Sequence, residues 1–145
     1  MDALPAERSL DAEDLKLIGL FSAVTRTAAL DVLRTDDRFL FVVPNDEVGK
    51  AVGKGGAKLK DLRERLGKGV DVVGYDPDPA GFVRNIFRSY GVESVTIEDR
   101  QGAKVAKVKV AAESKGRAIG RNGKTVKTAA ELAKRNVGVD QVVVE

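Results

Sequence analysis

The first half of the chain changes its spacing of apolar residues several times. They first recur every three or four positions, as on one face of a helix. They then run continuously or alternate, as strands do, and the helical spacing returns on both sides of a glycine-rich break. We predict, in chain order, a helix over 12–24 with Asp11 as its N-cap, strands over 27–35 and 38–44, two short helices broken at 53–56, and a strand over 69–75.

The second half repeats this order. Asp78 and Pro79 are N-cap and first-turn signals for its first helix. The glycine loops of the two halves lie 67 residues apart, from Gly53 to Gly120, and a repeat at this period indicates two units of about 70 residues. After the first helix we predict strands over 92–98 and 104–111, a short helix over 114–119, a longer helix after the second loop, and a strand over 139–145.

This pattern predicts an α+β fold built from two tandem domains. Each has the order helix–strand–strand–helix–loop–helix–strand, in which a three-stranded sheet packs on helices. The turn-rich segment YDPDP at 75–79 separates them. We therefore expect a first domain over 1–75, which includes the N-terminal helix, and a second domain over 76–145.

Positive charge is concentrated around the two glycine loops. Residues 45–68 carry 7 basic and 4 acidic side chains, and residues 104–136 carry 10 and 2. The segments 1–44 and 69–103 each have more acidic than basic side chains. Runs of lysine and arginine are often only the solvated faces of helices. Two separate maxima centred on glycine loops nevertheless favour a polyanionic partner.

The composition excludes several kinds of chemistry. The chain has no cysteine and no histidine, so disulfides, cysteine-based metal sites and the commonest general base are ruled out. No nucleophile–base set stands out, and we expect no enzymatic activity, no cofactor and no metal. The acidic N-terminus has no apolar signal core, and no apolar run approaches the length of a membrane span. We therefore expect a cytoplasmic protein with no membrane partner.

The two glycine loops have the same local sequence pattern. AVGKGG (51–56) and AIGRNG (118–123) each have an aliphatic residue before the first glycine and a basic residue after it. Glycines at both ends let another backbone approach closely, and the amino end of the following helix attracts anions. A Gly-x-x-Gly sequence can also be a bare helix–helix turn, but this setting suits binding of a sugar-phosphate backbone.

On these motifs the sequence resembles tandem KH domains, in which such a loop between two helices clamps nucleotides of a single strand. A helix ahead of two strands, with a strand at the end, is similar to the type II variant. Two such modules in so short a chain resemble the archaeal NusA-like transcription termination/antitermination factors. The resemblance implies single-stranded RNA binding by two loops in tandem, in regulation of termination or antitermination. A nascent transcript or an rRNA leader is the expected RNA.

The resemblance also implies partners and site residues. The chain has no room for the polymerase-binding and S1 domains of bacterial members, so we expect contact with RNA polymerase to be indirect or weak, and we expect a monomer. Val43, Val52, Val110 and Ile119 are candidates for an apolar groove floor or for ordinary core packing. The implied RNA-binding residues are Val52, Gly53, Lys54, Gly55, Gly56, Lys58 and Lys60 at the first loop, and Ile119, Gly120, Arg121, Asn122, Gly123, Lys124 and Lys127 at the second.

Three alternatives follow from the same residues. A P-loop would use NGKT at 122–125, but its first glycine would fall at Ala118, after a helix instead of a strand. A base-stacking platform would need more aromatic side chains than this chain offers, since Phe21, Phe82 and Phe87 fall on helical apolar faces. A KH-based ribosome-associated or translational adaptor protein is the remaining alternative function.

Overall fold

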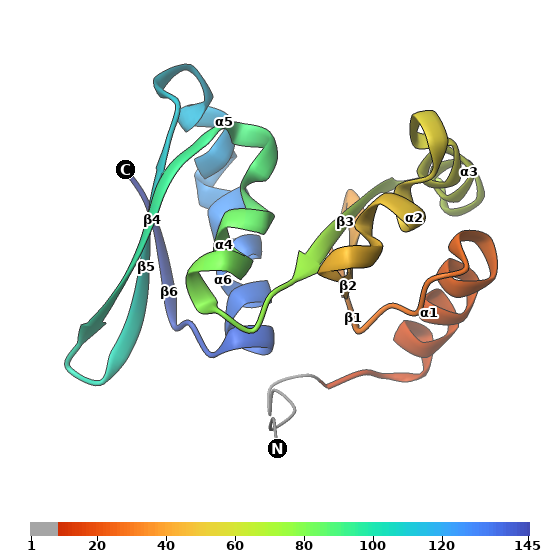
Figure 1. Cartoon of the computed structure of the whole chain (residues 1–145), viewed down its shortest axis with the longest axis horizontal. Coiled ribbons are helices and arrows are strands. Elements are labelled where there is room, and N and C mark those ends of the chain that lie inside the picture. The colour runs from red at the N-terminus through yellow and green to blue at the C-terminus, as the bar shows by residue number, and fades with distance from the viewer. Residues whose placement is uncertain (1–8) are drawn as a thin grey trace. The chain divides into compact units, whose positions relative to one another are not determined.

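The structure, a computed structural model, describes residues 9–145. These residues divide into two compact units, Ser9–Tyr75 and Asp76–Glu145, which are described one at a time below (Figure 1). The expected first domain starts at residue 1, and its first eight residues lie outside the described part of the chain.

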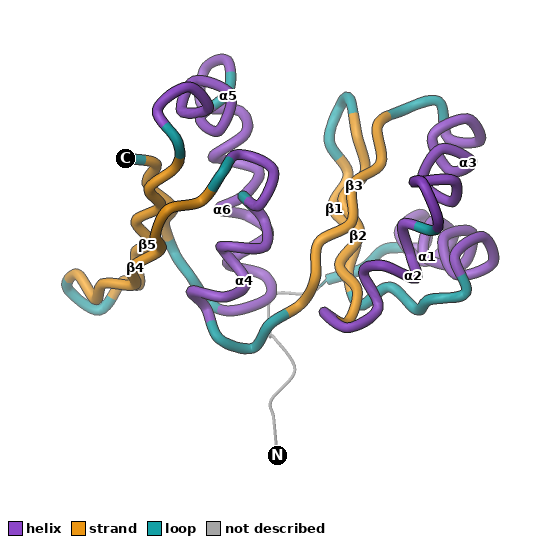
Figure 2. Tube along the Cα trace, turned by 45° about the horizontal axis from the view of Figure 1, so that its top comes forward, coloured by secondary structure: helices purple, strands orange, loops and turns teal. Residues whose placement is uncertain are grey.

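The first unit has one helix, two strands, two further helices and a last strand. β2 lies in the centre of the sheet, antiparallel to β1 and parallel to β3. Figure 2 shows the three helices on the same side of this sheet. The elements are α1 (Ala12–Thr25), β1 (Asp31–Arg34), β2 (Arg38–Pro44), α2 (Val48–Val52), α3 (Ala57–Leu66) and β3 (Gly69–Tyr75).

The helix α1 begins with a capping box, and Asp11 is its N-cap, as predicted. The Asp11 carboxylate accepts a hydrogen bond from the Asp14 amide at 2.8 Å, and the Asp14 carboxylate accepts from the Asp11 amide at 3.0 Å. Arg34 on β1 adds ion pairs to Asp11 at 2.7 Å and to Asp14 at 3.0 Å. The Asp14 amide, with the Arg34 guanidinium, holds the pKa of Asp11 below its ordinary value. These contacts fix the start of α1 against the sheet.

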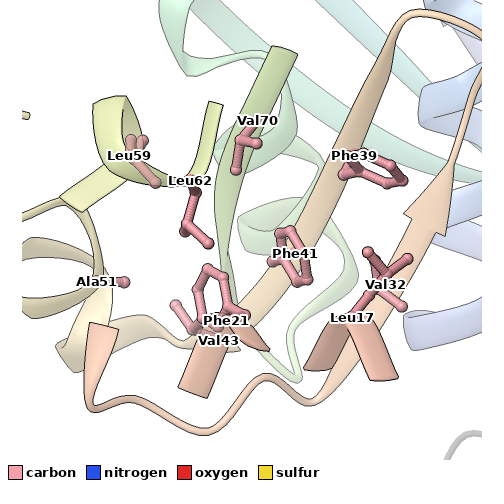
Figure 3. Packing of buried hydrophobic residues seen from close by; sticks show 10 residues of the cluster. All are labelled: Leu17, Phe21, Val32, Phe39, Phe41, Val43, Ala51, Leu59, Leu62 and Val70. Carbon is pink, nitrogen blue, oxygen red and sulfur yellow. The ribbon is translucent and has the colours of Figure 1, made fainter. Parts of the chain in front are cut away.

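The core of the first unit lies between the sheet and its helices. Phe21 of α1 stacks on Phe41 of β2 with ring centroids 4.3 Å apart, and both side chains are fully buried (Figure 3). Leu62 of α3 and Ala51 of α2 are also fully buried in this cluster. Each helix that borders the first glycine loop therefore has an anchor in the core.

The predicted strand over 27–35 was wrong in its first four residues and in its last, because β1 runs over Asp31–Arg34. Arg26 has a left-handed backbone (φ 63°), which ends α1. The Thr25 hydroxyl accepts a hydrogen bond from the Thr27 amide at 3.1 Å. This side-chain bond turns the chain after the helix, so β1 begins at Asp31.

The second unit repeats this order. Its central strand is β5, antiparallel to β4 and parallel to β6. Figure 1 shows α4 and α6 on one face of its sheet. The elements are α4 (Pro79–Ile86), β4 (Val92–Arg100), β5 (Ala103–Val110), α5 (Lys115–Ile119), α6 (Lys124–Val137) and β6 (Gln141–Val144). The fold is thus α+β, with two three-stranded mixed sheets each packed on helices, as predicted.

Local signals again explain the helix ends in the second unit. The Asp78 carboxylate accepts from the Gly81 amide at 3.2 Å, as an N-cap does. α4 is shorter than its apolar face suggests, because a 3-10 helix over Arg88–Tyr90 follows it and Gly91, at φ 69°, ends that segment. Phe87 from the end of α4 is fully buried in this core, with Val83 and Ala106.

Candidate nucleic-acid interface

The two Gly-x-x-Gly loops have the same backbone conformation. Gly53 and Gly120 both have φ 80°, with ψ 167° and 165°. The third positions, Gly55 and Asn122, are both left-handed, with φ 64° and 57°. The last glycine is left-handed in each loop as well, with φ 77° and 74°. The repeat seen in the sequence is therefore a repeat of geometry.

The first glycine of each loop is required by sterics as well as by its backbone angles. A Cβ on Gly53 would lie 2.8 Å from Cγ of Lys58. A Cβ on Gly120 would lie 2.7 Å from the backbone amide of Thr125 and 2.4 Å from its hydroxyl oxygen. Residue two of the following helix therefore packs directly on this glycine in both loops.

We expect Gly120→Ala to destabilise the second loop more than Gly53→Ala destabilises the first. At Gly120 the clash is with backbone, which cannot rotate away, and at Gly53 it is with a flexible lysine stem. Both changes also place alanine at positive φ, which costs more than about 1 kcal/mol. Chemical denaturation measures the change in the free energy of unfolding. Gly116→Ala is the matched control, because Gly116 is helical and a Cβ there meets nothing within 4 Å.

The helices after the loops begin with their amino ends uncapped by side chains. Gly56 precedes α3 and Gly123 precedes α6, and neither N-cap position makes a side-chain hydrogen bond. No acidic residue lies in the first turn of either helix. The first amides of a helix lack intrahelical partners and carry partial positive charge. Each loop thus leads into a helix end that favours an anion.

Exposed cations surround these helix ends. Lys54 and Arg121 at the loop tips are exposed, and so are Lys60 and Lys127 one turn along the following helices. Within residues 9–145, none of these four takes part in an ion pair. The stem of Lys127 approaches the loop, since a Cβ on Gly123 would lie 3.8 Å from its Cε. These charges are therefore free to meet phosphates.

Lys124 and Lys58, two further sequence-predicted site residues, are placed differently. Lys124 is exposed at the start of α6 but already interacts with another group of the protein. Lys58 is half-buried, and its ammonium donates to the backbone oxygens of Thr25 and Lys50, both at 2.9 Å. The structure thus does not group Lys58 with the exposed cations.

The apolar candidates divide into core residues and residues at the loop. Val43 is fully buried and Val110 is 4% exposed, and both belong to core clusters. Val52 and Ile119, which directly precede the loop glycines, keep partial exposure. Of the four candidates, Val52 and Ile119 alone combine some accessible surface with a position beside a loop.

A cation–aromatic pair beside the second loop was missed by the sequence analysis. Arg117 of α5 lies over the ring of Tyr90, with its guanidinium carbon 5.8 Å from the ring centroid. Arg117 also donates to the Ser114 hydroxyl at 3.2 Å. The available signal was the basic residue three positions before the first glycine, which is Lys50 in the first loop and Arg117 in the second.

Among residues 9–145, no group of three or more acidic side chains could hold a metal ion. No helix in that part of the chain is long and apolar enough to cross a bilayer.

Comparison with known families identifies the class of protein. Residues 79–142 match the family model of the NusA-like second KH domain. This match includes the second loop, with its uncapped helix and exposed cations, and shows that residues 79–142 form a KH domain.

Comparison with single proteins gives similarity over nearly the whole chain. It is 38% identical to the "Probable transcription termination protein NusA" of Halobacterium salinarum, over 92% of this chain and 95% of that protein. It is 31% identical to the protein of the same name from Methanocaldococcus jannaschii, over 96% of this chain and 76% of that one. The crystal structure of APE1850 is similar in fold and sequence, with a TM-score of 0.77 and 36% identity, and covers 94% of this chain and 100% of that one.

The chain belongs to the family of archaeal NusA-like transcription termination proteins. This family consists of transcription factors and not of enzymes.

Proposed function

We propose that the protein binds single-stranded RNA through its two Gly-x-x-Gly loops, and that this binding serves transcription termination or antitermination. The observation that carries the proposal is the repeated geometry of the loops. Each has the same backbone, an exposed cation at its tip and an uncapped helix end behind it. A nucleic-acid strand carries regularly spaced phosphates along its backbone, and these are anions that such a site can bind.

The role in transcription is supported by the family. Relatives with similarity over most of their length are called probable transcription termination proteins. A nascent transcript or an rRNA leader in the cytoplasm is the RNA that such a factor meets. We propose that each unit is one KH module, with boundaries at 1–75 and 76–145, that the protein acts as a monomer, and that contact with RNA polymerase is indirect or weak.

The RNA contacts are assigned to residues at both loops. The exposed cations Lys54, Lys60, Arg121 and Lys127 neutralise phosphates, with Lys124 beside them. The glycines at both ends of each loop, with Gly55 and Asn122 between them, let the RNA backbone approach closely. Val52 and Ile119 offer apolar surface to a base, as aliphatic groove residues of KH modules do.

We expect the purified protein to prefer an unstructured RNA strand over a duplex of the same length. A splayed single strand can present its phosphates to a loop and its bases to the aliphatic side chains, and a duplex cannot. The logarithm of the association constant should fall with the logarithm of salt concentration by about 0.7 per phosphate contact. Fluorescence anisotropy at several salt concentrations measures both. Equal affinity for strand and duplex would contradict the proposed KH-type binding.

A further inference from the structure

One lysine beside the first loop bridges the ends of two helices. The Lys58 ammonium donates to the carbonyl oxygen of Thr25, the last residue of α1, at 2.9 Å. It also donates at 2.9 Å to the carbonyl oxygen of Lys50, in the last turn of α2. Carbonyls in the last turn of a helix lack intrahelical partners and carry partial negative charge. A single cation therefore satisfies the ends of both helices.

The end of α1 needs such a cation from outside. α1 has no basic residue in its last turn. Thr25 is fully buried, so water does not readily replace a lost hydrogen bond at its carbonyl. Lys58 supplies the missing donor from α3, 33 residues further along the chain.

The same side chain fixes the first glycine of the loop. A Cβ on Gly53 would lie 2.8 Å from Cγ of Lys58 and 3.2 Å from its Cδ, so the lysine stem lies against this glycine. The lysine thus covers the point where α2 ends and the loop begins, and its ammonium continues to the end of α1.

The second loop is held by other means. The corresponding residue is Thr125, whose hydroxyl oxygen lies 2.4 Å from the Cβ position of Gly120. Threonine carries no positive charge. The preceding helix carries a cation here, since Arg117 of α5 lies over the ring of Tyr90. The two loops therefore share a backbone conformation but not the side chains that support it.

We infer that Lys58 is a positioning residue for the first loop and not a phosphate ligand. It binds the carboxyl-terminal ends of α1 and α2 together and so presents Gly53–Gly56 in its binding conformation. This inference rests on the proposed RNA binding for its functional consequence, while the bridge itself is a property of the protein alone.

The salt dependence of RNA binding separates the two roles. Lys58→Met keeps the aliphatic stem over Gly53 and removes the charge, and Lys54→Met does the same at the exposed loop tip. Removal of a phosphate ligand lowers the salt slope by about 0.7, which we expect for Lys54→Met. For Lys58→Met we expect several-fold weaker binding with an unchanged slope. A slope reduced as much as in Lys54→Met would make Lys58 a phosphate ligand and overturn the inference.

Amide hydrogen exchange in the free protein tests the bridge without RNA. The Gly53 amide donates to the Gly49 carbonyl at 3.0 Å, and the Arg26 amide donates to the Ser22 carbonyl at 2.8 Å. In Lys58→Met both amides should exchange roughly tenfold faster, as for the loss of one charge-assisted hydrogen bond. The Gly120 amide, which donates to Gly116 at 2.9 Å, should keep its rate and serves as the internal control.

The hydrogen-exchange measurement and the RNA-binding measurement test separate claims. Unchanged exchange at Gly53 and Arg26 would overturn the bridge whatever the RNA measurement gives. If the unaltered protein binds no RNA, the proposed function fails, and the exchange rates still decide whether Lys58 holds the loop. Lys60→Met is the matched control for the exchange measurement, because Lys60 is an exposed lysine of the same helix and its loss should leave exchange at Gly53 and Arg26 unchanged.

Discussion

A protein carrying Lys54→Asp, Gly55→Asp, Arg121→Asp and Asn122→Asp is expected to bind RNA at least about 100-fold more weakly than the unaltered protein. Each charge-assisted contact to a phosphate contributes about 1.5–3 kcal/mol, and about 1.4 kcal/mol is a factor of ten. Two loops lose such contacts, and each also gains repulsion. Anisotropy titration with an unstructured RNA at low salt measures the loss.

The loop backbone should tolerate these changes. Gly55 and Asn122 have left-handed backbones, which aspartate and asparagine adopt more readily than most residues. A Cβ on Gly55 meets nothing within 4 Å, and the second loop already carries a side chain at this position. Circular dichroism and a thermal melt should therefore match those of the unaltered protein.

Gly55→Asn is the matched control for the charge reversal. It gives the first loop the same third residue as the second, in the same backbone conformation. RNA affinity should change little, because no charge is altered. A folded quadruple variant that kept its RNA affinity would show that the loops are not the binding surface, and the proposed function would have to be given up.

The sequence predicted the parts of the structure that depend on neighbouring residues. Asp11 and Asp78 were identified as N-caps because a cap bonds to an amide two or three residues along the chain. The loops were identified because their glycines recur in the same order between helical segments. The uncapped amino ends of α3 and α6 follow from the same short motifs.

The sequence did not predict contacts between distant segments. The resemblance implies Lys58 as an RNA-binding residue together with Lys54 and Lys60. The partner of Lys58, the Thr25 carbonyl, belongs to another helix and has no signature in the sequence. The pair of Arg117 and Tyr90 was missed for the same reason, since the two residues belong to different elements. The sequence thus predicts the two candidate loops, but it does not predict the side-chain contacts around each of them.

The buried side of a strand was also only partly predictable. Alternation along β5 places Ala106, Val108 and Val110 on one face of the strand, and all three are buried. Val105 points to the other face and is 1% exposed, which alternation does not predict. It lies between Glu98 of β4 and Gln141 of β6 in the register of the sheet. A central strand can lose solvent on both faces, because long polar neighbours cover it.

RNA affinity is expected to rise about 100-fold or more once a single strand is long enough to occupy both loops. One KH loop holds about four nucleotides, which limits what a single module can gain. A short connection between two modules makes the second binding event intramolecular, with an effective concentration in the range of about 1 mM. The linked pair can then exceed either module by about 10²- to 10⁴-fold.

The connection between the two units is short and locally fixed. β3 ends at Tyr75 and α4 begins at Pro79, so only residues 76–78 lie between them. The Asp76 carboxylate accepts a hydrogen bond from the Asp78 amide at 2.9 Å, and Pro77 restricts its own backbone. A long flexible linker would lower the effective concentration of the second site, and this short connection does not.

A length series of unstructured RNAs, from about four nucleotides upward, tests whether the two loops hold one strand. The charge reversal is made in one loop at a time, as Lys54→Asp with Gly55→Asp or as Arg121→Asp with Asn122→Asp. Each double variant should bind short RNAs through its intact loop and lose the step at greater length. The variant that keeps the second loop should bind short RNAs more tightly, because residues 104–136 carry more basic side chains than residues 45–68. If affinity levels off at the length of one module, or if two short RNAs bind as well as one joined strand, the loops are independent sites and tandem binding is wrong.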